Sequence, residues 1–262
     1  MPQKRGPNPA RQAALEALRR QVRALEGGGL GAGMVSLGSA GGLLAQTLAR
    51  GATHEVVGDD YLDGPAAAGF ALCVCARALV SQPGVLVWVS APGSFDFGAP
   101  YGAGWARLGL DPGRVLFVRA PDLAQAQGAM EEAARTPGIA AVFGMLGARV
   151  SSTVGRRLQL AAETGGGFVT VWRPAGAQAL AGVRSRWGVS GLSSAVPVWA
   201  QEAGLKGRAL PPGLSAFRLT PLKGRTQERP IAAEWRNATD GFYPIAPLVD
   251  RAPTYAPQMA YG

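Results

Sequence analysis

The stretch with the clearest capacity for chemistry lies between residues 54 and 80, where an apolar run, a loop and a helical run follow one another. The loop reads GDDYLDGP, and the residues that could act on a ligand are Gly58, Asp59, Asp60, Asp63, Gly64 and Pro65. A strand, a glycine-bearing loop and a helix in this order bind the phosphates of ATP in many proteins, because N–H groups at the helix start face the phosphates. The residue types decide whether this loop still does so.

The loop departs from the phosphate-binding pattern at the positions that contact a nucleotide. The pattern G-x-x-x-x-G-K-[ST] has a Lys and a Ser or Thr after its second glycine. Here the spacing from Gly58 to Gly64 is one residue too long, Pro65 stands in place of Lys, and Ala66 stands in place of Ser or Thr. Pro65 has no N–H, and a carboxylate ~5 Å from a phosphate opposes it by about 3 kcal/mol at an effective dielectric constant of ~20. The sequence therefore predicts a degenerate phosphate loop, with Pro65 starting the helix and the aspartates near its positive end.

Two further positions of an ATPase are also changed. An acid that holds magnesium should end the fourth apolar strand, but residues 139–148 contain no Asp or Glu and place Gly144 there. An acid that activates water should follow the strand VLVWV, where Ser90-Ala91-Pro92 stand instead. We therefore expect no nucleotide cofactor and no ATP hydrolysis, and we predict that the chain is not an enzyme.

The remaining reactive side chains favour structural roles. His54 is the only histidine and lies in a strand-like run, so a Ser–His–Asp or Cys–His arrangement would have to use it. Cys73 and Cys75 are two residues apart on an apolar helix and point to different sides, which predicts buried free thiols in a reducing cytosol. Glu131 and Glu132 lie on a predicted helix and are interpreted as a solvated face. No spacing of His, Cys and Asp suits a metal ion.

The elements that must position these residues alternate between strand and helix. Apolar runs predict strands at His54–Val57, Val85–Val89, Val115–Val118, Ala140–Met145 and Phe168–Trp172. Helical stretches lie between them at Ala66–Val80, around Tyr101–Leu108, at Asp122–Arg135 and at Ser152–Glu163. Strands that are apolar throughout and alternate with helices predict an α/β fold with a mostly parallel, helix-covered sheet. Later runs at Arg186–Val189, Ala216–Leu222 and Ile231–Trp235 predict further strands, the last two joined as a C-terminal β-hairpin by LKGRTQERP.

The α/β domain is expected over residues 53–236, with a different segment on each side. Residues 1–26 are a basic N-terminal segment whose helix places Leu15, Leu18, Val22 and Leu25 on one apolar stripe. This stripe must dock on the body of the chain or on a partner, because two heptads are too short for an independent coiled coil. We interpret residues 27–52 as a Gly-rich flexible linker and residues 237–262 as a Pro- and aromatic-rich tail that is disordered when unbound.

The positive charge of the chain is concentrated outside its central body. The formal net charge is +9, and basic residues gather in the first 26 residues and around the hairpin. Such flanks favour polyanions, most often nucleic acid, or are solvated faces. The candidate DNA contacts are Arg208, Lys223, Arg225 and Arg229. The first residues have no apolar signal core and no run is long enough to span a bilayer, so we expect a soluble cytoplasmic protein.

Several of these segments resemble a known family. MVSLGSAGGLLAQTLARGATHEVVG is similar to the lead-in of RecA-type recombinases, with Glu55-Val56-Val57-Gly58 as the strand end before the loop. RLTPLKGR is similar to a late strand of the same core, whose Lys-x-Lys/Arg pair, here Lys223 and Arg225, reaches the neighbouring subunit's nucleotide in active filaments. LEALRRQVRALE, LGLDPGRVLFVRA, AMEEAARTPGIAAVFG and RRLQLAAE resemble the ImuA family, which is RecA-like, catalytically degenerate and related to the SulA cell-division inhibitors. The resemblance covers about residues 11–236.

The resemblance implies a function in DNA repair. ImuA-like proteins act in a damage-induced (SOS) translesion synthesis complex with ImuB, an inactive polymerase-like protein, and an error-prone DnaE-type polymerase, and they contact RecA. The chain would then be a non-catalytic adaptor in mutagenesis. Two alternatives stay open: a SulA-like inhibitor of cell division, and a divergent ATPase with other ligands. The stretch between Pro174 and Gly213 matches poorly the part of a recombinase that binds DNA.

The apolar stripe of the first helix generates a prediction. Leu18→Asp and Val22→Asp should weaken partner binding and leave the fold intact, because a buried carboxylate opposes docking of the stripe. Pull-down of partners together with soluble expression measures both effects. Loss of soluble expression would show that the stripe belongs to the core of this chain.

Overall fold

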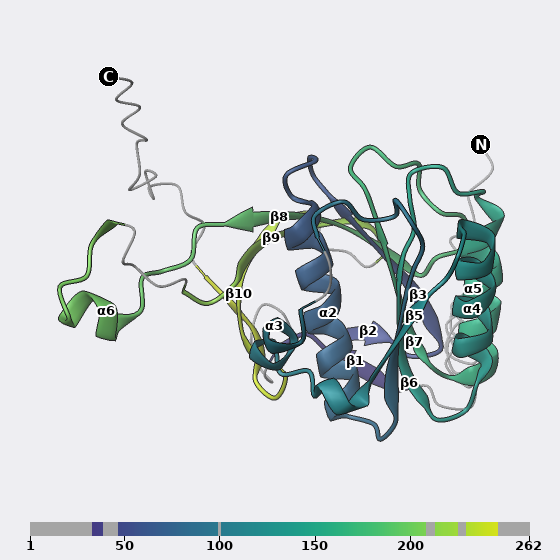
Figure 1. Ribbon diagram of the computed structural model, residues 1–262, viewed down its shortest axis with the longest axis horizontal. Coiled ribbons are helices and arrows are strands. Elements are labelled where there is room, and N and C mark those ends of the chain that lie inside the picture. Colours follow the sequence, from purple (N-terminus) through teal and green to yellow (C-terminus); the bar gives the residue numbers. More distant parts are fainter. Residues whose placement is uncertain (1–32, 39–46, 99–100, 208–212, 225–228, 246–262) are drawn as a thin grey trace, which may run out of the picture.

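The computed structural model describes residues 33–38, 47–98, 101–207, 213–224 and 229–245. It is a mixed α/β structure built around one large sheet, with helix α2 on one face and helices α4 and α5 side by side on the other (Figure 1). The helices are α2 (Gly64–Val80), α3 (Gly102–Arg107), α4 (Leu123–Arg135), α5 (Thr153–Gly165) and α6 (Val198–Glu202), with a short 3-10 helix η1 (Pro112–Arg114). This confirms the predicted α/β class and the mostly parallel sheet.

The sheet has a parallel part and an antiparallel extension. The parallel strands are β3 (Ala52–Gly58), β4 (Val85–Ser90), β5 (Val115–Arg119), β6 (Ile139–Met145), β7 (Phe168–Arg173) and β8 (Ser185–Leu192). The extension consists of β9 (Ala216–Lys223), β10 (Ile231–Asn237) and β11 (Gly241–Pro244), and the order across the sheet is β11-β10-β9-β8-β3-β7-β6-β4-β5. The crossovers from β3 to β7 each contain a helix, whereas β7 and β8 are joined by a segment of turns. Each predicted strand and helix of the central body is confirmed.

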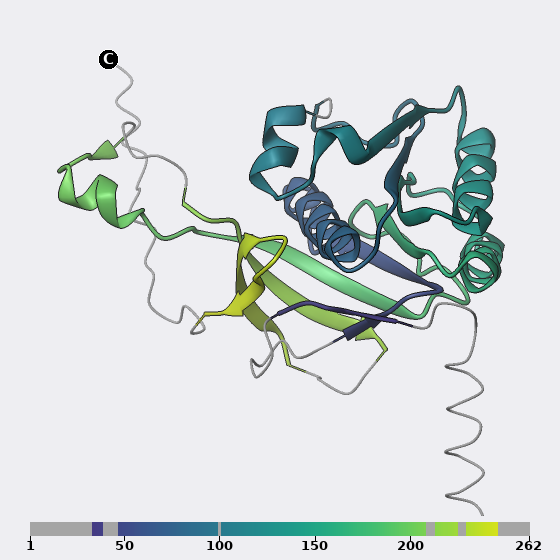
Figure 2. The same ribbon diagram turned by 90° about the horizontal axis from the view of Figure 1, so that it is seen from below.

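Helix α2 is buried on almost every side, which explains its apolar and small-residue composition. The parallel strands lie against one side of it, while the antiparallel extension and a short ribbon lie nearer its other side (Figure 2). Cys73 and Cys75 are buried free thiols, as predicted, and burial raises the pKa of Cys75 to about 12. These thiols stay protonated and act as small apolar groups.

The expected linker and tail are wrong in part, because each contributes a strand. Residues 27–52 include β1 (Met34–Ser36) and β2 (Thr47–Ala49), which pair antiparallel, and residues 237–262 include β11. Val35, Leu37 and Phe242 are buried against α2. Arg77 of α2 joins the two segments, since its guanidinium donates to the carbonyls of Ser36 (2.9 Å) and Ala238 (2.8 Å). Residues 27–32, 39–46 and 246–262 of the two segments, and the stripe of Leu15, Leu18, Val22 and Leu25, lie outside the described residues.

A buried ion cluster connects the parallel strands beneath the loops at their ends. Glu55 of β3 and Arg173 of β7 are fully buried, with the Glu55 carboxylate 3.6 Å from guanidinium nitrogens of Arg173 and Arg186. Glu55 also accepts from the backbone N–H of Leu180 at 3.2 Å. Arg173 donates to the carbonyls of Gly147 (3.1 Å) and Ala148 (2.8 Å). The cluster thereby fixes two connecting segments against three strands.

The two neighbouring glutamates of α4, Glu131 and Glu132, lie in different environments. Glu131 is not a solvated residue, because it is buried and its carboxylate lies 2.9 Å from the guanidinium of Arg157 and 3.6 Å from that of Arg135. Glu132 is exposed as expected. The ion pair between Glu131 and Arg157 joins α4 to α5, and the sequence of α4 alone does not show that α5 lies this close.

No helix within the described ranges is long and apolar enough to cross a membrane.

His54 has the structural role that its strand position predicts. The ring is buried, stacks on Phe168 with centroids 4.9 Å apart, and shares hydrogen bonds with the Ser185 hydroxyl (2.8 Å) and the Ala49 carbonyl (2.9 Å). Burial lowers the pKa of His54 to about 4, and the positive charge of Arg184 acts in the same direction. The neutral ring is therefore the folded form.

This pKa predicts a stability that depends on pH. The unfolded chain protonates His54 near its ordinary pKa of ~6.5, whereas the folded chain does not until about pH 4, so stability is complete above pH ~6.5 and falls as the pH is lowered. Between pH 7 and pH 5 the wild type should lose ~2 kcal/mol of unfolding free energy. Urea unfolding at both pH values measures it. His54→Gln should show much less of this loss, and an equal loss in both proteins would contradict the prediction.

Candidate functional site

The carboxylates of the candidate loop are directed at β8. Asp59 donates its N–H to the carbonyl of Val189 (3.2 Å), and its carboxylate accepts from the Ser190 hydroxyl. The Asp63 carboxylate accepts from the N–H of Gly191 at 2.8 Å, and that of Asp60 accepts from the N–H of Asp63 at 3.1 Å. Asp59 and Asp63 therefore fix the loop to the neighbouring strand β8, and Asp60 accepts a hydrogen bond within the loop.

The backbone N–H groups that a phosphate would need are largely engaged within the protein. Gly64 donates to the carbonyl of Tyr61 (3.1 Å) and Ala67 to that of Asp63 (2.9 Å). Pro65, near the start of α2 as predicted, has no N–H. A phosphate loop instead leaves several successive N–H groups open toward the ligand. The first turn of α2 offers a phosphate few donors.

Aromatic side chains cover the same helix start. The ring of Phe97 lies directly against Gly64, and a Cβ at position 64 would collide with it. Tyr61 packs on Phe97 with ring centroids 4.8 Å apart and donates its hydroxyl to Asp96 at 2.8 Å. From the sheet, the indole of Trp172 donates to the carbonyl of Gly64 at 3.0 Å. An apolar contact surface thus occupies the position where a phosphate would meet the helix dipole.

Gly144, the predicted position of the lost magnesium-holding acid, lies on the face of β6 that α4 covers. A Cβ at this position would collide with the side chain of Met130 on α4, so an acid there would point into the core on the face away from α2. The neighbouring residues of β6 that face α2 are Phe143 and Met145. At the end of β6, the side chain on the face that carries α2 is therefore the apolar thioether of Met145. The sequence pattern predicts the strand, but it does not show which face of the sheet each of its residues occupies.

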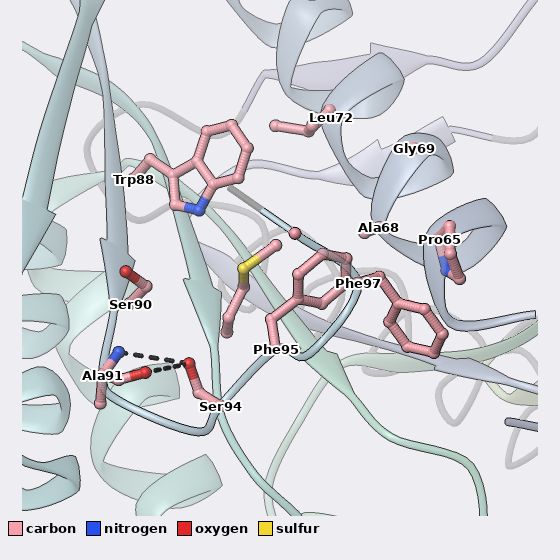
Figure 3. A pocket seen from close by; sticks show the side chains of 12 residues that line it. Pro65, Ala68, Gly69, Leu72, Trp88, Ser90, Ala91, Ser94, Phe95 and Phe97 are labelled. Carbon is pink, nitrogen blue, oxygen red and sulfur yellow. Dashed lines mark hydrogen bonds between the residues drawn. The ribbon is translucent and has the colours of Figure 1, made fainter. Parts of the chain in front are cut away.

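A cavity of about 250 Å³ lies beside the loop, between α2 and the ends of β4 and β6 (Figure 3). Trp88, Phe95 and Phe97 form aromatic walls, and Pro65, Ala68 and Leu72 of α2 form another side. Ser90 lies at the wall formed by β4, at the place where a water-activating acid was sought. Asp96 is the nearest acid in sequence, and it is exposed and bonded to Tyr61. The cavity is apolar where a hydrolytic site needs charge.

A second cavity of about 240 Å³ lies at the start of α2. Its lining includes Tyr61, Gly64, Phe97 and Trp172. Sequence analysis missed these aromatic residues, because they come from three separate segments. Nothing in their local sequence indicates that they meet. Trp172 reaches the Gly64 carbonyl because β7 lies between β3 and β6 in the parallel sheet. Within the described part of the chain, His, Cys, Asp and Glu form no group that could hold a metal ion.

The candidate DNA contacts lie elsewhere. Lys223 is exposed at the end of β9 and pairs in register with Arg186, near the start of β8, whereas the loop bonds to the other end of β8 at Ser190 and Gly191. Arg229 is exposed before β10. Arg208 and Arg225 lie outside the described residues. The structure therefore separates Lys223 from the degenerate loop along the length of β8.

The fold and this site define an α/β protein whose turn before α2 is closed by aromatic side chains. In sequence, the chain is 35% identical over 162 residues to the protein ImuA of Caulobacter vibrioides, in strains NA1000 / CB15N and ATCC 19089 / CIP 103742 / CB 15 alike. The match covers 57% of this chain and 64% of the relative, so the chain spans somewhat less than two thirds of the length of the relatives it matches. This confirms the resemblance to ImuA.

Two other comparisons are less informative. No family model matches the chain. Among solved structures, SulA from Pseudomonas aeruginosa aligns with 47% of this chain and 98% of its own, at 19% sequence identity and a TM-score of 0.37. A likeness at this score carries no argument about function.

The contacts of Asp63 generate a prediction for the loop. Asp63→Ala removes the acceptor for the Gly191 N–H and should lower the free energy of unfolding by about 1–2 kcal/mol. Asp63→Asn keeps a side-chain oxygen at the same place and should cost less than half as much. Thermal or urea unfolding compares the three proteins. Equal stability of the alanine variant and the wild type would contradict the anchoring role of the carboxylate.

The exposed basic residues generate another. Lys223→Ala combined with Arg225→Ala should lower any DNA affinity and reduce its dependence on salt concentration, because each phosphate contact releases counterions. Fluorescence anisotropy with labelled DNA at several salt concentrations measures both. Lys206→Ala combined with Arg149→Ala, at two exposed positions elsewhere, serves as a charge-matched comparison. An unchanged affinity and slope would identify the pair as a solvated face.

Proposed function

We propose that the chain is a non-catalytic adaptor in a damage-induced translesion DNA synthesis complex. The observation that carries the proposal is the 35% identity to ImuA over 162 residues. The partners that we propose are an ImuB-like inactive polymerase homologue and RecA, with an error-prone DnaE-type polymerase acting through them. The proposed function belongs to the SOS response and mutagenesis, and it implies a cytoplasmic location.

The absence of catalysis is supported by the geometry of the loop. A triphosphate would have to displace Phe97 from Gly64, break the Asp63–Gly191 bond and lie among three carboxylates. The residue of β6 that faces α2 is Met145, and β4 ends at Ser90, which Ala91 follows. These features disfavour the ATPase alternative. In this proposal a RecA-like scaffold is retained for binding partners.

Exposed apolar residues supply surfaces on which a partner could bind. The connection between β8 and β9 extends away from the body and carries α6 at its far end (Figures 1 and 2). Val198 and Trp199 of α6 are 67% and 59% exposed. Aromatic residues of this kind are frequent at the centres of protein interfaces. Together with the N-terminal stripe, α6 is a reasonable target for disrupting the complex.

Affinity purification from cells treated with a DNA-damaging agent tests the proposal. The tagged chain should recover the polymerase-like partner or RecA, and Trp199→Ser with Val198→Ser should reduce recovery while the far-UV spectrum stays unchanged. Leu160→Ser, on an exposed leucine of α5, is the matched control. Recovery of neither RecA nor a polymerase subunit would contradict the proposal.

A genetic measurement separates this function from the division-inhibitor alternative. Deletion of the gene should lower the frequency of damage-induced mutations, and overexpression should leave cell length unchanged. Filamentous cells on overexpression, with an unaltered mutation frequency, would favour the SulA-like function instead.

A further inference from the structure

The cavity between α2 and the end of β4 has a feature that the proposed adaptor function does not use. Its wall includes Trp88, which is 3% exposed and whose indole Nε1 has no hydrogen-bond acceptor among the described residues. Figure 3 shows this nitrogen on the ring edge turned between Ser90 and Phe95. A buried donor left without an acceptor costs roughly 1–3 kcal/mol. The cavity therefore offers a directed donor inside an apolar wall.

Packing on its other sides fixes the donor in place. The Trp88 ring contacts Trp105, Phe117 and Phe143, with centroids 5.2, 5.6 and 5.1 Å away. A rigid ring cannot turn its N–H toward another acceptor without losing these contacts. The side chain that can move instead is Met145, which lines the cavity and is an unbranched, flexible thioether. An incoming acceptor can thus reach Nε1 by a change of one methionine rotamer.

The size, walls and charge of the cavity define what fits it. Its volume of about 250 Å³ lies below the 300–1,000 Å³ that is usual for drug-sized ligands, so a single pair of fused rings suits it better than a nucleotide. Phe95 and Phe97 give it aromatic walls on which a planar ring can pack. Asp96, between these two phenylalanines, and the aspartates of the adjacent loop oppose an anion.

We propose that this cavity binds a small, neutral, nitrogen-containing heteroaromatic ring, which packs between the aromatic walls and accepts a hydrogen bond from Trp88 Nε1. Free nucleobases belong to this chemical class, and phosphorylated nucleotides are excluded by size and charge. The site lies in a single chain and does not depend on the proposed adaptor function, so it is testable on the purified protein without a partner.

A pair of probes that differ in one atom tests the hydrogen bond. Quinoline carries a ring nitrogen acceptor, and naphthalene has the same shape without it. Quinoline should bind about fivefold more tightly than naphthalene, the effect of one neutral hydrogen bond. Ligand-observed nuclear magnetic resonance measures both affinities. Quinoline-2-carboxylate should bind more weakly than quinoline, because of the nearby aspartates.

The indole signals of the protein locate the ring. In a ¹⁵N–¹H spectrum the Trp88 indole N–H, assigned by its disappearance in Trp88→Phe, should shift with quinoline concentration more than the other five tryptophan signals. Ala68→Leu fills the cavity and should weaken binding about tenfold or more. Ala124→Leu makes the same change on the exposed face of α4 and should have no effect.

The outcomes separate clearly. Equal affinities for quinoline and naphthalene, or equal binding to the Ala68→Leu and Ala124→Leu variants, would overturn the proposal. A titration to the solubility limit of quinoline that leaves the Trp88 indole signal in place would overturn it as well.

Discussion

The contact of the Phe97 ring with Gly64 determines what the central loop of this protein can do. The start of a long helix concentrates N–H donors and positive dipole, which makes it a ready anion site unless something else occupies it. Here the Phe97 ring lies on Gly64, the first residue of α2. The Trp172 indole donates a hydrogen bond to the Gly64 carbonyl, and the N–H of Gly64 donates within the loop. The carboxylates of Asp59 and Asp63 then serve as acceptors toward β8. The loop therefore connects β3 to α2 and is bonded to β8.

A buried ion cluster stabilises the strands next to this loop. Glu55, three residues before Gly58, forms ion pairs with Arg173 and Arg186. Arg173 in turn donates a hydrogen bond to the segment that follows β6. Removing one member of such a buried cluster leaves an uncompensated charge, so its parts depend on one another. The antiparallel extension adds a second surface, and the connection between β8 and β9 carries α6 away from the body (Figure 2). This arrangement suits the proposed adaptor, which needs no nucleotide.

Local pattern predicted the fold well and the site only in part. Runs such as VLVWV and FVTVW are apolar throughout because both sheet faces are covered, so the strands and their parallel arrangement could be inferred from the chain alone. The prediction that the phosphate-binding Lys and the two acids are missing comes from the sequence in the same way. The closing residues could not, since Phe97, Trp172 and Gly64 meet only through strand order. The face of β6 on which Gly144 lies could not be inferred either, because a shift of one residue in a strand reverses the face. The strands of residues 34–36, 47–49 and 241–244 were missed because they are short and lie among glycines or prolines.

The central claim is that the start of α2 no longer receives a phosphate. Titration of the ¹⁵N-labelled protein with Mg²⁺–ATP, followed at the amides of residues 58–67 and at the Trp172 indole N–H, tests it most directly. The account predicts that these signals stay in place at millimolar nucleotide and that no phosphate is released. A saturable shift of these same amides, accompanied by displacement of the Trp172 signal and by ATP turnover, would contradict it.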